Sequence, residues 1–159
     1  MTASPLNFPE PPAAGARARM IANRSRDTAP ELALRRELYR RGLRYRVDAS
    51  LPIPGLSRRR IDIAFLRQRV AVLVDGCFWH GCPVHGTTAR TNSAYWTHKI
   101  LTNRLRDVDT NARLAAAGWT VVRVWEHEVK QGTSQIADRI QGLVRGNSGD
   151  TSSYLRTPL

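Results

Sequence analysis

Acidic residues and lysine are scarce in this 159-residue chain. Its 25 basic residues outnumber 13 acidic ones, which leaves a formal net charge of +12, and Lys99 and Lys130 are its only lysines. An excess of this size favours a polyanionic partner, and nucleic acid is the commonest one. Arginine suits such a partner because its planar guanidinium forms bidentate contacts with phosphate and guanine.

Cysteine and long apolar runs are also rare. No run approaches the roughly 20 apolar residues of a membrane span, and no signal-peptide core is visible, so we expect a cytoplasmic, nucleoid-associated protein without membrane contacts. The two cysteines, Cys77 and Cys82, lie close together with histidines nearby. This spacing favours metal binding in a reducing compartment over a disulfide.

Length and composition predict one domain with its own core, spanning residues 20–145. Residues 1–19 are rich in proline and alanine, carry a few arginines and show no apolar periodicity, so we expect a flexible basic arm. Residues 146–159 are rich in serine, glycine and threonine, and we expect a disordered tail there.

Apolar periodicity and turn residues predict seven elements in the order αβββαβα. In the first helix, Thr28 is a candidate N-cap, Pro30 fits the first turn and Glu31 completes a capping box. The second and third strands are expected to pair as an antiparallel hairpin. The order favours an α/β fold in which helices flank a mixed sheet. The predicted helices cover residues 28–42, 93–117 and 135–144, and the predicted strands cover 43–47, 60–66, 70–74 and 119–125.

The loop after the 70–74 strand concentrates metal-ligating residues. Cys77, Cys82 and His85 supply three ligands of the types that zinc prefers, whereas a structural zinc site needs four. His127 is the best fourth candidate because it follows a strand expected in the same sheet. His80 lies in the same loop and is an alternative to His85. A site closed by four protein ligands leaves no position for water, so this zinc is expected to be structural.

Two aspartates lie in or directly after the predicted hairpin. Asp62 stands between Ile61 and Ile63, where it either faces solvent on an alternating strand or binds a hard cation within the sheet. Asp75 follows the apolar third strand. If the two strands pair antiparallel, Asp62 and Asp75 become neighbours and could form a cradle for Mg²⁺.

Two further acidic residues and one histidine are candidates for acid/base chemistry. Asp107 shares a face of the long helix with Trp96 and Asn103, and it could orient the His80 imidazole as carboxylates commonly do. A solvated position is the alternative for Asp107. Glu31 could reach a metal-bound water, or it could serve only the capping box.

The adjacent aromatics Phe78 and Trp79 are unusual within a loop. Burial in the core would explain them, and so would a wedge that enters DNA and unstacks a weakened base pair. Trp96 on the long helix could belong to the same wedge. A third alternative is a stacking platform for single-stranded RNA.

These residues together resemble the very short patch repair (Vsr) family of DNA mismatch endonucleases over most of the chain, from about Met20 to His127. The string Gly76-Cys77-Phe78-Trp79-His80 is highly specific, and so is the order of the motifs around it. Those motifs are Arg26-Asp27-Thr28, Asp62, Tyr95-Trp96, Lys99-Ile100, Asn103, Asp107, Gly118-Trp119 and Val124-Trp125-Glu126.

The resemblance implies a restriction-endonuclease-like fold of the PD-(D/E)xK type, with residues 20–145 as the endonuclease domain and a structural zinc site. It implies Mg²⁺-dependent nicking of duplex DNA, 5′ to the thymine of a T:G mismatch, in very short patch repair. The expected partners are DNA with such a mismatch and mismatch-repair proteins, and the enzyme is expected to be a monomer.

Family roles carry over by position. The resemblance implies that Asp62 and the carbonyl of Val74 bind Mg²⁺, that His80 is catalytic with Asp107 as its partner, and that Glu31 lies near metal-bound water. The residues implied to intercalate beside the mismatch are Phe78, Trp79, Trp96 and Met20. The residues implied to form the zinc site are Cys77, Cys82, His85 and His127.

Two positions depart from the best-known family pattern. Asp75 stands where that pattern has a histidine, so an added carboxylate could bind Mg²⁺ directly. His127 stands where that pattern has a cysteine, so one cysteine and one histidine must exchange places among the zinc ligands. Asp75 keeps open a related restriction-type nuclease without mismatch preference. The other alternative is a non-catalytic, zinc-containing DNA-binding module.

Overall fold

The computed structural model describes residues 26–85 and 93–146. The predicted arm over residues 1–19, the candidate intercalating residue Met20 and all but the first residue of the predicted tail lie outside the described residues. No helix in the described part of the chain combines the length and the apolar character needed to cross a membrane.

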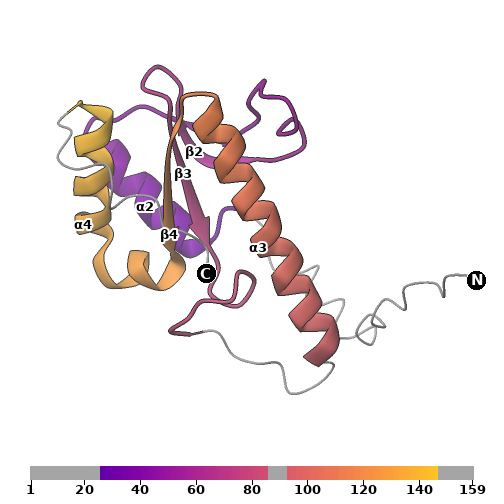
Figure 1. Ribbon diagram of the computed structural model, residues 1–159. Coiled ribbons are helices and arrows are strands. Elements are labelled where there is room, and N and C mark those ends of the chain that lie inside the picture. The colour runs from indigo at the N-terminus through magenta and orange to yellow at the C-terminus, as the bar shows by residue number, and fades with distance from the viewer. Residues whose placement is uncertain (1–25, 86–92, 147–159) are drawn as a thin grey trace, which may run out of the picture.

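A four-stranded mixed sheet forms the centre of the fold, with the strand order β1-β2-β3-β4 (Figure 1). Neighbouring strands are antiparallel except for β3 and β4, which run parallel. Figure 1 shows α3 on one face of the sheet and α2 with α4 on the other. The predicted α/β class, element order and hairpin are confirmed. The elements are α2 (Ala29–Arg40), β1 (Arg46–Ala49), β2 (Ile61–Phe65), β3 (Val70–Asp75), α3 (Ser93–Ala116), β4 (Thr120–Trp125) and α4 (Glu126–Val144).

Alternating side chains of β3 enter two hydrophobic clusters, one on each face of the sheet. Val70 and Val72 pack with residues of α2 and α4, whereas Ala71 and Leu73 pack in the cluster that contains Leu114 of α3. The strand is therefore buried on both faces, which explains its uninterrupted apolar sequence.

The parallel pairing of β3 with β4 positions the functional residues. Asp75, the last residue of β3, lies opposite Trp125, the last residue of β4. Because both carboxyl ends reach the same edge of the sheet, the loop after β3 meets the first turn of α4 there. Crevices at the carboxyl ends of parallel strands are common ligand sites in α/β proteins.

The predicted start of the first helix and the predicted first strand need correction. Thr28 precedes α2 but makes no side-chain capping hydrogen bond. The Glu31 carboxylate instead accepts hydrogen bonds from the Asp27 N–H (2.9 Å) and from the Arg35 guanidinium (3.1 Å). The capping box is therefore wrong, because Arg35 and the preceding loop hold the glutamate. The first strand begins at Arg46, later than expected.

The last helix begins nine residues before the predicted start at residue 135, since it starts at Glu126. A non-helical residue, Gly132, separates its first turns from the rest. The Glu128 carboxylate accepts a hydrogen bond from the Trp125 N–H (2.6 Å) and so caps the early start. His127 consequently lies in the first turn of a helix and not at the end of a strand.

Candidate functional site

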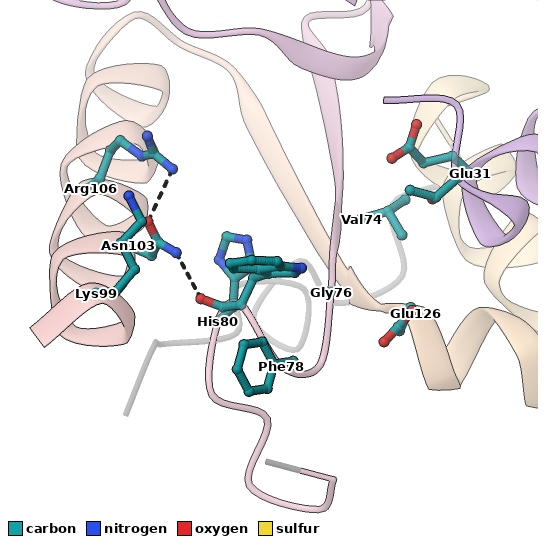
Figure 2. Close-up of a pocket in the computed structure, with 11 residues that line it drawn as sticks. Glu31, Val74, Gly76, Phe78, His80, Lys99, Asn103, Arg106 and Glu126 are labelled. Carbon is teal, nitrogen blue, oxygen red and sulfur yellow. Dashed lines mark hydrogen bonds between the residues drawn. The ribbon is translucent and has the colours of Figure 1, made fainter. Parts of the chain in front are cut away.

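A cleft of about 450 Å³ opens where the carboxyl end of β3 faces α2 and α3. Glu31 and Val74 line one side of it, and Figure 2 shows Lys99, Asn103 and Arg106 projecting from one helix on the other side. Lys99 and Arg106 bring two cations to the cleft, and such side chains are suited to contact with phosphates. The cleft therefore combines a carboxylate on one wall with cations on the other.

Asp62 lies beside this cleft, half-buried in β2. Its Oδ2 accepts a hydrogen bond from the N–H of Val74 (2.8 Å), which joins it to a residue of the cleft lining. Burial raises the pKa of the Asp62 carboxyl to about 7, and the nearby charges of Glu31 and Asp75 act in the same direction despite the Val74 hydrogen bond. The ionised form of Asp62 is thus destabilised by its surroundings, and a bound cation would stabilise it.

Glu31 reaches the cleft with its charge already paired. The residue is 3% exposed, and the guanidinium of Arg35 contacts both Glu31 (3.1 Å) and Asp27 (2.5 Å). Nε of Arg35 is buried and has no hydrogen-bond partner among the described residues. Glu31 therefore adds a fixed carboxylate to the cleft, whereas Arg35 limits the negative charge at this end.

His80 and Asp107 form a close pair between the loop after β3 and α3. Nδ1 of His80 lies 2.5 Å from Oδ2 of Asp107. Burial alone would raise the pKa of Asp107, but the hydrogen bond to His80 and the charge of Arg123 outweigh it and hold that pKa below its ordinary value. Since Asp107 is then an acceptor, Nδ1 carries a proton and Nε2 is left free for acid/base chemistry.

The loop that carries His80 is held by α3. Asn103 donates to the Trp79 carbonyl (2.8 Å), and Arg104 donates to the carbonyls of His80 (3.2 Å) and Gly81 (2.5 Å). Gly81 has a φ of +63°, and a Cβ there would lie 2.8 Å from the Ile100 side chain. A side chain at this position would strain the backbone and clash with Ile100, so glycine allows the loop to lie close against α3.

Arg123 of β4 contacts two of the predicted site residues but was not itself predicted from the sequence. Its guanidinium donates to Asp75 Oδ1 (2.6 Å) and to Asp107 Oδ1 (3.1 Å). Asp75 in turn lies 3.8 Å from His80 Nδ1. Potential ligand atoms of Asp75, His80 and Asp107 lie within 4.8 Å of one another, and this group does not include Asp62. The sequence signal was a lone arginine in an apolar strand, Thr120–Trp125.

Cys77, Cys82, His85 and His127 converge as predicted. Their potential ligand atoms all lie within 4.8 Å of one another. Nδ1 of His127 is 3.1 Å from the Cys77 sulfur and 3.6 Å from the Cys82 sulfur. Two thiols and two imidazoles are a donor set that tetrahedral zinc takes, at bond lengths of about 2.0–2.3 Å. The group fits zinc, and His80 belongs to the other group.

Phe78, Trp79 and Trp96 form one aromatic cluster at the cleft. Their ring centroids lie 5.0–5.8 Å apart in edge-to-face arrangements, and each side chain is half-buried. Phe78 and Trp79 also line the cleft. The rings are thus neither core residues nor fully exposed, and they lie beside the His80–Asp107 pair.

Proteins similar to this chain include a DNA mismatch endonuclease and nicking enzymes. The family model described as DNA mismatch endonuclease Vsr matches residues 13–85. The type II nicking enzyme V.NaeI of Lentzea aerocolonigenes is 43% identical over 140 residues, which cover 87% of this chain and 84% of that protein. The chain belongs to the Vsr family. The Vsr family consists of DNA endonucleases, and this protein is one of them.

Two further relatives extend the comparison of this Vsr-family chain. The type II nicking enzyme V.NmeDIP of Neisseria meningitidis serogroup C is 36% identical over 132 residues, 82% of this chain and 86% of the relative. The DNA mismatch endonuclease Vsr of Escherichia coli K12 is 39% identical over 110 residues, 67% of this chain and 66% of the relative.

Proposed function

We propose that this Vsr-family endonuclease nicks duplex DNA 5′ to the thymine of a T:G mismatch and requires Mg²⁺. The observation that carries the proposal is the aromatic cluster of Phe78, Trp79 and Trp96 beside the His80–Asp107 pair. Aromatic wedges enter duplexes most easily where pairing is weak, so they favour a mismatch. The names of the relatives, mismatch endonuclease and nicking enzyme, support both the substrate and the cutting of one strand.

Asp62 and the carbonyl of Val74 would hold the catalytic Mg²⁺. The raised pKa of Asp62 supports this assignment, because a buried carboxylate near other acidic groups is stabilised by a divalent cation. Magnesium bound there would polarise the scissile phosphate and lower the pKa of an attacking water.

The other roles belong to side chains around the cleft. His80, with Nε2 free, would exchange a proton with the attacking water or the leaving oxygen. Asp107 would keep the imidazole in the required tautomer and orientation. Lys99 and Arg106 would contact phosphates and make DNA affinity fall with salt. Cys77, Cys82, His85 and His127, here called the zinc group, would hold the loop that bears His80 in place.

A nicking assay with end-labelled duplexes tests the function. We expect cleavage of a T:G duplex in Mg²⁺, 5′ to the thymine and on one strand, with little cleavage of the matched T:A duplex and none without Mg²⁺. Equal cleavage of both duplexes would indicate a related nuclease without mismatch preference. Tight binding without cleavage would indicate a DNA-binding module instead.

Replacement of Trp96 by alanine tests the wedge. Stacking of a base on an aromatic ring contributes about 1–3 kcal/mol, so we expect affinity for the T:G duplex to fall roughly 5- to 150-fold. Affinity for the matched duplex should change little, because the rings do not insert there. Fluorescence anisotropy with both duplexes measures the difference. Tyr39→Ala, which removes a 60%-exposed ring on α2, is the control. An equal loss for both duplexes would contradict the wedge.

A further inference from the structure

Arg123 is a buried cation between two buried carboxylates. Its side chain is 6% exposed, and those of Asp75 and Asp107 are 9% and 11% exposed. One guanidinium nitrogen contacts each carboxylate, at 2.6 Å and 3.1 Å, and Nε donates to the Asn111 side chain (2.9 Å). All three guanidinium nitrogens thus donate hydrogen bonds, and these bonds fix the orientation of the planar group.

In this arrangement the two carboxylate oxygens of Asp107 have different partners. Oδ1 accepts from Arg123, whereas Oδ2 lies 2.5 Å from His80 Nδ1. With Oδ1 fixed by the guanidinium, the carboxylate plane cannot turn away from the imidazole. A chain of hydrogen bonds therefore runs from Asn111 through Arg123 and Asp107 to His80.

Asp75, at the end of β3, is the second carboxylate that Arg123 holds. We call this arrangement of Asp75, Arg123 and Asp107 the clamp. Without Arg123, Asp75 and Asp107 would be two buried like charges next to His80, an arrangement that attracts a metal ion or a proton. The guanidinium supplies the compensating positive charge within the protein. The group of Asp75, His80 and Asp107 is therefore neutralised by a protein side chain, that of Arg123, without a metal ion.

We infer that Arg123 is a positioning residue for the nicking reaction. It orients Asp107 toward His80 and engages Asp75 as its counter-ion, so Asp75 serves the histidine and does not bind Mg²⁺. This inference rests on the proposed function of the same site, and it replaces the sequence-based expectation that Asp75 is a magnesium ligand.

Single-turnover nicking by Arg123→Lys tests the clamp, because lysine keeps the positive charge but lacks the planar guanidinium whose separate nitrogens contact Asp75 and Asp107. With saturating T:G duplex and Mg²⁺, misplacement of the catalytic pair should lower the rate about 100-fold while DNA affinity stays within about threefold. Arg40→Lys, at an ion-paired arginine on the surface of α2, is the matched control. An unchanged rate in a folded Arg123→Lys protein would overturn the inference.

Asp75→Asn separates the clamp from metal binding. If Asp75 partners Arg123, the rate falls about tenfold or more and the half-saturating Mg²⁺ concentration stays nearly constant. A tenfold rise in that concentration, with the rate restored at high Mg²⁺, would show that Asp75 binds the metal and would overturn the inference. Should the Arg123→Lys protein fail to fold, Asn111→Ala gives a third variant, because it removes the acceptor of the Arg123 Nε–H. Its single-turnover rate should fall below that of the wild-type protein, and an unchanged rate would count against the inference.

Nuclear magnetic resonance provides a readout that does not require activity. The resonances of the Arg123 guanidinium N–H groups can be assigned because they disappear in Arg123→Lys. In the wild-type protein these N–H groups should exchange slowly with solvent. In Asp75→Asn their exchange should become faster. If the wild-type protein cut no DNA, the proposed function would fail while this signal still reported the clamp. Rapid exchange in the wild-type protein would overturn the clamp itself.

Discussion

Asp62→Asn is expected to remove nicking activity while it stabilises the Mg²⁺-free protein at neutral pH. Asparagine keeps an oxygen that can accept the Val74 N–H bond but loses the charge that would bind Mg²⁺. Loss of metal-derived transition-state stabilisation of several kcal/mol lowers the single-turnover rate on the order of 10³-fold or more.

The gain in stability follows from the raised pKa of Asp62. The unfolded chain releases this proton near the ordinary value of 3.8, whereas burial holds the folded-state pKa at about 7. The proton-linked contribution is therefore fully present below pH 3.8 and is lost as pH rises through about 7. The loss for the wild-type protein is on the order of 2–4 kcal/mol, and Asp62→Asn should avoid it.

Urea unfolding at pH 5 and pH 8, in buffer free of Mg²⁺, measures this effect. The stability of the wild-type protein relative to Asp62→Asn should fall between the two pH values, and added Mg²⁺ should recover stability only for the wild-type protein. Asp109→Asn is an instructive control, because hydrogen bonds from Arg113 and Arg59 lower the pKa of Asp109 and no gain is expected there. Equal stability of wild-type and Asp62→Asn protein at pH 8 would contradict the account.

The parts of this site that could be predicted from the sequence are those with local patterns. The apolar runs predicted β2 and β3, and the shared edge of two parallel strands explains why Cys77 and His127 meet. In the observed register Asp75 lies opposite Trp125, so each ligand follows its strand end by two residues. His80 and Asp107 were paired through a helical face and a family pattern, and the structure places them in contact.

The parts that could not be predicted depend on contacts between distant residues. No local pattern marks the role of Arg123, since its partners Asp75 and Asp107 lie 48 and 16 residues away. The early start of α4 was missed because Gly132 breaks the helical pattern after its first turns. Glu31 matched a capping box, yet the charge of Arg35 decides where its carboxylate lies.

Removal of zinc is expected to disable the enzyme through the loop after β3. The loop bears Phe78, Trp79 and His80 between Cys77 and Cys82, so loss of the proposed zinc would move both the proposed wedge and the proposed acid/base residue. Burial raises the pKa of the Cys77 thiol to about 11, so only a bound cation makes the sulfur a thiolate at neutral pH. We therefore expect about one zinc per chain in the purified protein.

Cys77→Ser should lower the zinc content to background and the nicking rate by about 100-fold or more, because the catalytic loop loses its position. Hydrogen–deuterium exchange should rise over residues 76–85 and remain low in β3 and β4, whose cores do not depend on the metal.

His85→Ala and His98→Ala form a matched pair of exposed histidines, only the first of which belongs to the zinc group. His85→Ala should weaken zinc retention, whereas His98→Ala should not. Full activity in zinc-free protein would show that packing against α3, through Asn103 and Arg104, is sufficient to hold the loop.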